Sequence, residues 1–127
     1  METFIINSTV KTYPTNLPYQ AIKDKILGTR YNLSLTFVGK KRAADLNEAY
    51  RQKTYVPNVL SFPLDESTGE IFICPAIIEK EAPKFNLSPI GYVAFLFIHG
   101  CLHLKGLDHS DTMDKLEQKY LKLFNIS

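Results

Sequence analysis

Apolar and polar residues alternate along 31–38, as they do in a strand that buries one face. Residues 3–10 are rich in β-branched and aromatic side chains and predict a further strand near the start of the chain. Two more runs, 59–62 and 70–74, are separated by a short segment that contains a glycine, which predicts an antiparallel hairpin. Pro63 is expected to end the first strand of that hairpin.

Apolar residues three and four positions apart predict helices over 18–27 and 43–50. Gly28 is expected to end the first helix, and the second is expected to turn inward Ala43, Leu46 and Tyr50. Between strand and helix, the basic residues of 40–42 are expected to form a solvated turn; contact with phosphate is the alternative interpretation.

The longest apolar stretch lies in a predicted helix over 90–104. Ser88 followed by Pro89 is typical of a helix start, with a capping hydroxyl before a proline at the first helical position. Because this helix is apolar on nearly every side, it is expected to be the buried central element of the core. A short helix is predicted before it, over 75–82, and a final helix is capped by Ser110 or Asp111. The apolar stripe of that final helix is Met113, Leu116, Tyr120, Leu123 and Phe124.

Strands and helices mix without strict alternation, which indicates an α+β fold: a small mixed sheet of about four strands packed with helices. The 127 residues are expected to form a single domain, residues 1–127, large enough for its own core. The formal net charge of +2 is too small to indicate a nucleic-acid partner and does not exclude one. Cys74 and Cys101 lie in apolar surroundings and are expected to be buried free thiols. Without a signal peptide or a long apolar span in this sequence, a cytoplasmic protein is the expectation.

All three histidines of the chain lie within eleven residues, 99–109. His99 and His103 are four apart on the predicted helix, so both imidazoles project from one face and can bind one metal ion. Gly106 follows, where the chain can leave the helix and turn back to bring His109 to the same ion. Three protein nitrogens leave a fourth tetrahedral position open, which is the arrangement of catalytic zinc sites.

The same spacing occurs in the metzincin proteases, which place a glutamate directly after the first histidine as general base. Here that position holds Gly100, so a peptidase would need another carboxylate to act on the zinc-bound water. The candidates nearest in the sequence are Asp65, Glu70 and Asp108. Asp108 has two further interpretations, orienting a histidine ligand or capping the last helix.

Two blocks of this sequence resemble the YbeY family of bacterial endoribonucleases. The first is His-Gly-x-Leu-His-Leu-x-Gly-x-Asp-His, complete over 99–109; the second comprises Leu46-Asn47, Tyr50-Arg51, Lys53, Val59-Leu60-Ser61-Phe62-Pro63 and Gly69-Glu70-Ile71. The chain departs from the family pattern at Pro57-Asn58, where Thr-Asp is usual, at Leu107, where an aromatic residue is common, and at Glu70, where the family has aspartate.

The resemblance implies a zincin-like fold and a zinc-dependent, single-strand-specific endoribonuclease with one Zn²⁺ per chain. It further implies a role in maturing the 3′ end of small-subunit ribosomal RNA and in ribosome quality control, with single-stranded rRNA and the small subunit or ribosome-associated proteins as partners. The implied site residues are His99, His103 and His109 as metal ligands, and Arg51 for activity.

The chemistry of the residues agrees with this implication, because zinc activates bound water near neutral pH and a guanidinium fork suits two phosphate oxygens. Water or the 2′-hydroxyl of the RNA can be the nucleophile, and the sequence leaves both open. Two other functions stay open as well: a zinc metalloprotease-like hydrolase, and a non-catalytic, zinc-stabilised module that binds the ribosome. The oligomeric state is left open.

Overall fold

Four strands form one mixed sheet in the order β1-β2-β4-β3, in a computed structural model that describes residues 3–127. Strand β2 (Asn32–Phe37) lies parallel to both β1 (Phe4–Ser8) and β4 (Thr68–Ile73), and β3 (Val59–Asp65) lies antiparallel to β4. The predicted mixed sheet of about four strands and its hairpin are therefore confirmed.

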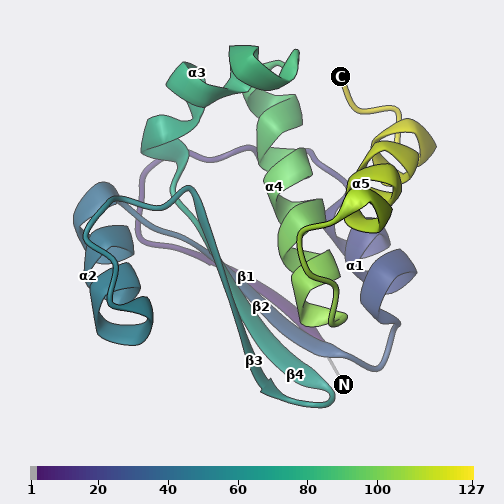
Figure 1. The fold of residues 1–127 in the computed structure, drawn as a ribbon, viewed down its shortest axis with the longest axis horizontal. Coiled ribbons are helices and arrows are strands. Elements are labelled where there is room, and N and C mark those ends of the chain that lie inside the picture. The colour runs from purple at the N-terminus through teal and green to yellow at the C-terminus, as the bar shows by residue number, and fades with distance from the viewer. Residues whose placement is uncertain (1–2) are drawn as a thin grey trace.

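Helices connect and cover these strands (Figure 1). Helix α1 (Tyr19–Leu27) ends at Gly28, whose φ of 95° is in the left-handed region that favours glycine. Helix α2 (Lys40–Arg51) follows β2, and short turns lead from β4 to the long helix α4. These turns are η1 (Pro75–Ile77), α3 (Ile78–Glu81) and η2 (Ala82–Phe85); after them come α4 (Pro89–Leu104) and α5 (Asp111–Leu123).

The start of α2 and the length of β3 correct the sequence predictions. The basic residues 40–42 form the first helical turn of α2 rather than a turn before it, since Gly39 takes the extended N-cap conformation and Lys41 pairs with Asp45 one turn later, at 3.1 Å. Strand β3 continues through Pro63, because β3 is an edge strand and its outer side needs no backbone donor.

The inward faces of two helices also differ from the prediction. In α2, Tyr50 is 68% exposed and its place among the buried residues is taken by Asn47. In α5, Leu123 is 51% exposed, whereas Glu117 and Leu121 are buried in line with Met113. The sequence pattern leaves more than one helical face possible, and packing against the neighbouring elements decides which of these faces is buried.

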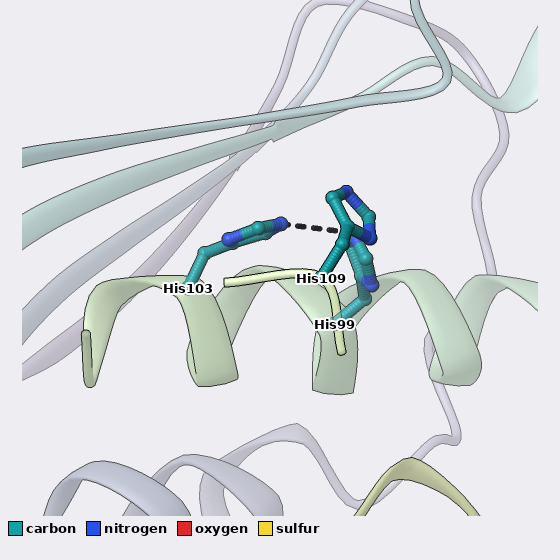
Figure 2. Close-up of side chains that lie close together, drawn as sticks. All are labelled: His99, His103 and His109. Carbon is teal, nitrogen blue, oxygen red and sulfur yellow. Dashed lines mark hydrogen bonds between the residues drawn. The ribbon is translucent and has the colours of Figure 1, made fainter. Parts of the chain in front are cut away.

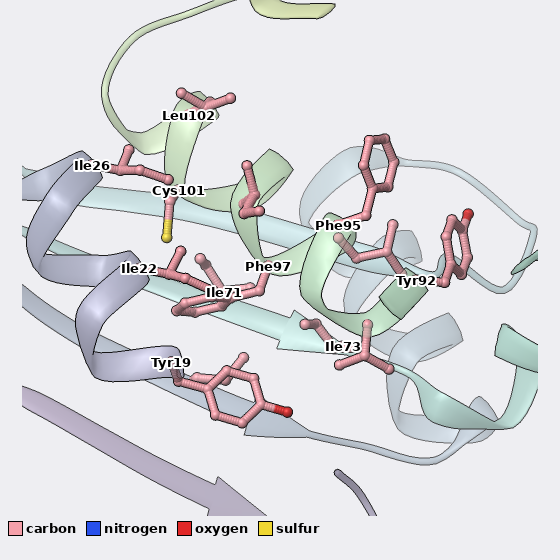
Figure 3. Close-up of a cluster of buried hydrophobic side chains, with 14 of the residues drawn as sticks. Tyr19, Ile22, Ile26, Ile71, Ile73, Tyr92, Phe95, Phe97, Cys101 and Leu102 are labelled. Atoms are coloured by element: carbon pink, nitrogen blue, oxygen red, sulfur yellow. The ribbon is translucent and has the colours of Figure 1, made fainter. Parts of the chain in front are cut away.

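The core lies between one face of the sheet and the helices α1 and α4 (Figures 1 and 3). The alternation in β2 puts Leu33, Leu35 and Phe37 into this core, where Ile71 and Ile73 of β4 join them. Helix α2 packs separately, with Ala43 against Val38 and Cys74. The sheet is therefore covered mainly by α4, which has neighbours on all sides.

Helix α4 is buried along nearly its whole length, as its composition predicts. The Oγ of Ser88 accepts a hydrogen bond from the backbone N–H of Gly91 at 3.0 Å, which caps the helix. Both cysteines are free and buried, and Cys101 lies in the core (Figure 3). Among residues 3–127 no single helix is long and apolar enough to cross a membrane, though the bent pair Pro75–Phe85 and Pro89–Leu104 passes that test when the two are taken together.

Candidate metal centre and its cavity

The three histidines lie together although they come from two segments (Figure 2). His99 and His103 project from the last turns of α4, and His109 lies in the connection between α4 and α5. One nitrogen from each ring lies within 4.8 Å of the other two, so the group can hold a metal ion. Gly106 makes this return possible, since its φ is 104° and the chain reverses there.

The rings meet at close range, with centroids 4.5 Å apart for His99 and His103, and 4.9 and 5.0 Å from these two to His109. The Nε2 atoms of His99 and His103 are 3.1 Å apart. Two nitrogens on one tetrahedral zinc, at Zn–N distances of ~2.0–2.1 Å, lie about 3.3 Å from each other. The observed spacing is therefore close to that of two ligands of one ion.

The outer nitrogens of two of these rings are held by hydrogen bonds. The Nδ1 of His99 lies 2.5 Å from a carboxylate oxygen of Glu117, and the Nδ1 of His103 lies 3.0 Å from the backbone carbonyl of Leu107. Since both partners are acceptors, each Nδ1 is assigned the proton, and each Nε2 keeps its lone pair. Two lone pairs that face each other repel, and a cation between them removes that repulsion.

The electrostatics also favour neutral imidazole at this site. Burial lowers the pKa of His103 below its ordinary value, and the neighbouring His99 and His109 lower it further. Neutral imidazole is the form that binds a metal ion. The donor set, its spacing and the neutral form favoured at His103 therefore fit a metal ion.

Glu117 is the site residue that the sequence analysis missed. It is 5% exposed, on the face of α5 that also buries Met113 and Leu121. The signal was present: these three residues are four apart, and a carboxylate among buried positions of a helix needs a partner. Only the packing of α5 against α4 shows that the partner is His99.

A cavity of about 630 Å³ opens over the histidines. Its walls come from the α2–β3 connection, from β3, from α4 and from α5, so segments far apart in the sequence share it. Arg51, the last residue of α2, lies in the wall together with all three histidines. The structure thus brings together the four residues that the sequence analysis singled out as candidate site residues.

Arg51 is held in place without being neutralised. One of its terminal nitrogens, Nη1, donates to the side-chain oxygen of Asn47 at 3.3 Å and to the hydroxyl of Tyr55 at 3.4 Å. The buried Asn47 in turn donates to the backbone carbonyl of Tyr55 at 3.0 Å, which holds the middle of the 52–58 loop against α2. Within residues 3–127 no carboxylate pairs with Arg51, so its charge is available to an anionic ligand.

The acidic candidates for peptide hydrolysis lie elsewhere. Asp65 and Glu70 are on the β3–β4 hairpin, and neither they nor Asp108 are among the described residues that line the cavity. Asp108 does not cap α5 either, because the Oγ of Ser110 accepts the hydrogen bond from the backbone N–H of Met113. The carboxylates that do line the cavity are Asp114 and Glu117, and Glu117 is engaged by His99.

Gly100 occupies the metzincin glutamate position for a reason of packing. A Cβ at this residue would lie 3.0 Å from the Cδ1 of Ile71 and 3.2 Å from the Oγ of Ser61. Both distances are shorter than ordinary van der Waals contact, so α4 rests on β3 and β4 through the bare backbone of Gly100.

Comparisons with known proteins show what this chain is similar to. The family model described as endoribonuclease YbeY matches residues 5–125. An endoribonuclease YbeY from Mesoplasma florum is 37% identical over 126 residues, covering 91% of this chain and 67% of that protein. One from Mycoplasma mycoides subsp. mycoides is 34% identical, covering 81% of this chain and 78% of that protein. A protein of Thermotoga maritima, solved in solution, has a similar fold at 27% identity, with a TM-score of 0.68 over 94% of this chain and 87% of that one.

The hydrogen bond from His99 predicts that Glu117 strengthens metal binding. We expect Glu117→Ala to weaken Zn²⁺ binding about 10- to 100-fold, the usual cost of losing a carboxylate behind a histidine ligand. Glu117→Gln, which keeps an acceptor oxygen, should lose less. Competition with a chromophoric chelator measures the affinity. Asp114→Ala is the matched control on the same helix, and equal affinity in Glu117→Ala and the wild type would contradict the assignment.

The close approach at Gly100 predicts that a glutamate there destabilises the fold. We expect Gly100→Glu to lower the free energy of unfolding by about 1–3 kcal/mol, since the added atoms overfill the contact with Ile71 and Ser61. Urea unfolding followed by circular dichroism measures the change. Gln118→Glu adds the same charge at an exposed position of α5 and should change stability by less than about 0.5 kcal/mol. A fully stable Gly100→Glu variant would show that α4 has room to move.

Proposed function

This chain belongs to the family described as endoribonuclease YbeY, and from that premise we propose that it is a zinc-dependent endoribonuclease specific for single-stranded RNA. Its substrate would be ribosomal RNA, with maturation of the 3′ end of the small-subunit rRNA and ribosome quality control as its roles. It would work in the cytoplasm, as one domain over residues 1–127, with the small subunit or ribosome-associated proteins as partners. The observation that carries the proposal is one cavity that joins three convergent imidazoles to an unpaired guanidinium.

The proposed ligands are His99, His103 and His109. The ring nitrogens of His99 and His103 that face each other hold lone pairs because Glu117 and the carbonyl of Leu107 take the opposite nitrogens. A bound zinc ion would supply a Lewis acid and activated water near neutral pH. The described residues offer three ligand-type side chains to this group and no fourth, which leaves one side toward the cavity.

Arg51 is the proposed phosphate-binding residue. Its guanidinium is permanently charged and planar, and it can donate two parallel hydrogen bonds to the oxygens of a phosphodiester. Asn47 and Tyr55 orient the side chain through one nitrogen, so the remaining donors are left for the substrate. Stabilising the negative charge that builds up during cleavage is the role we assign to Arg51.

The placement of the charged groups favours RNA over peptide as substrate. A peptidase would need a carboxylate placed as general base at the metal, yet Gly100 fills the metzincin position and Glu117 is bound to His99. Asp114 also lines the cavity but does not belong to the group of histidines. Arg51 is the one cationic side chain among the described residues that line this cavity, and its guanidinium suits a phosphate rather than a peptide group. A purely structural zinc site would not call for a cavity that leads to the metal with an unpaired arginine in its wall.

Removal of a metal ligand should abolish zinc binding and RNA cleavage together. We expect His103→Ala, loaded with zinc and dialysed, to hold far less than one ion per chain and to leave a labelled unstructured oligoribonucleotide intact. The wild type should cut that strand and spare the same strand in a duplex. Metal content by mass spectrometry and cleavage on gels give the two readouts. A His103→Ala protein that retains one zinc per chain would refute the ligand assignment.

Replacement of Arg51 should separate catalysis from metal binding. We expect Arg51→Ala to keep its zinc and its fold while RNA cleavage falls on the order of a hundredfold, as for loss of one charged group that stabilises a transition state. Arg51→Lys keeps the charge but not the fork and should lie between. Single-turnover rates with saturating enzyme measure the effect. Full activity of Arg51→Ala would remove Arg51 from the proposed site, and loss of folding would make its role structural.

A further inference from the structure

The cavity wall also carries a cluster of aromatic rings that metal binding does not use. Phe85 of η2 stacks on Tyr92 of α4, with centroids 5.0 Å apart and an interplanar angle of 24°. Phe85 also lies 5.3 Å from Phe95, and Tyr92 and Phe95 are nearly parallel at 5.9 Å. Figure 3 shows that Tyr92 and Phe95 belong to the same end of α4. All three rings line the cavity.

This aromatic cluster, Phe85, Tyr92 and Phe95, continues to the metal centre. The ring of Phe95 lies 6.2 Å from that of His99, at an interplanar angle of 31°. Two ring-to-ring steps therefore lead from the proposed ligand His99 to Phe85 at the cavity wall. That separation is short enough for a phosphate at the histidines and a base of an adjoining nucleotide at Phe85.

Phe85 differs from its two partners in exposure. Tyr92 and Phe95 are 1% and 9% exposed, whereas Phe85 is 48% exposed. One side of the Phe85 ring covers the other two rings, and much of the rest is open. A half-exposed ring costs free energy in water, and here it forms part of a concave surface next to a candidate active site.

Polar contacts hold the base of the aromatic cluster in place. The hydroxyl of Tyr92 donates to the carboxylate of Glu81 at 3.1 Å, and the side-chain amide of Asn58 donates to the same carboxylate at 3.0 Å and to the Tyr92 oxygen at 3.1 Å. These bonds use both amide hydrogens of Asn58. Because Tyr92 is fixed in this way, Phe85 stacks on a rigid support and needs little ordering when a ligand stacks on its exposed side.

We propose that the exposed face of Phe85 is a nucleobase subsite, on which one unpaired base next to the cleaved phosphate stacks. The inference rests on the proposed endoribonuclease function. Bases stack on aromatic side chains with little regard to sequence, but a base inside a duplex has both faces covered by its neighbours. Stacking on Phe85 therefore supplies a physical reason for a preference for single strands that the metal and Arg51 alone do not give.

The first test separates substrate binding from bond cleavage. Phe85→Leu keeps an apolar side chain at a half-exposed position but removes the flat ring. We expect KM for an unstructured oligoribonucleotide to rise about tenfold with little change in kcat, the pattern for a contact made equally in ground and transition states. Phe85→Tyr should restore KM. The matched control is Leu123→Ala, at a position of similar exposure outside the cavity, which should leave both parameters as they are.

The second test measures binding rather than turnover. The sequence contains no tryptophan, so Phe85→Trp introduces a single tryptophan at the proposed subsite, whose fluorescence can be excited apart from that of the tyrosines. We expect a 2′-O-methyl oligoadenylate to quench it strongly, and an abasic sugar–phosphate oligomer of equal length to quench it little. Leu123→Trp is the control fluorophore and should respond to neither.

The outcomes distinguish this inference from the function beneath it. If the oligomer quenches Phe85→Trp but the protein cuts no RNA, the proposed subsite is supported and the proposed endoribonuclease function is refuted. If Phe85→Leu cleaves RNA with an unchanged KM, the subsite is overturned while the endoribonuclease function stands. The same holds if an enzyme that cleaves RNA shows equal quenching of Phe85→Trp by the base-bearing and the abasic oligomers. Stronger quenching by a peptide rich in aromatic residues would also overturn it, by assigning the surface to a protein ligand.

Discussion

The contact between α4 and the sheet at Gly100 determines where the candidate site lies. Because this residue has no side chain, the helix rests directly on Ile71, and burial on its other sides fixes its rotation. The direction of His99 and His103 follows from that rotation, since side chains on a helix cannot turn independently of its axis. The polar ends of these rings then reach the cavity while the rest of the helix stays in the core. A catalytic group held in this way costs little entropy to position.

The parts of the fold and the site that could be predicted from the sequence are those set by local spacing. The period of β2, the Ser88-Pro89 start of α4 and the four-residue step from His99 to His103 each depend on neighbours within one or two turns. Gly106 is equally local, since glycine takes the positive φ that often ends a helix without steric cost. That is why the mixed sheet, the buried helix and the meeting of three imidazoles could be expected before any coordinates.

What the sequence could not provide depends on contacts between distant segments. The partner of Glu117, His99, is 18 residues away on another helix, and it cannot be predicted from the sequence pattern of α5. Which face of α5 turns inward is decided by α4, so Leu121 is buried where Leu123 was expected. Likewise, the sequence predicts that Pro63 ends its strand. Only the order of the strands shows that β3 is at the edge of the sheet, where a proline is tolerated.

The same reasoning explains how one histidine spacing can serve two chemistries. The spacing specifies a metal ion, but the reaction depends on which charges surround that ion. In this chain the buried carboxylate nearest to the histidines orients His99, and the position after His99 is needed for packing. The cavity wall carries the cation of Arg51 together with the carboxylate of Asp114. Under the proposed function Arg51 binds the phosphate of an anionic chain, and no carboxylate belongs to the group of histidines as a general base for a peptide. Charge alone does not distinguish a single strand from a duplex, so the proposed subsite at Phe85 would supply the preference for an unpaired nucleobase.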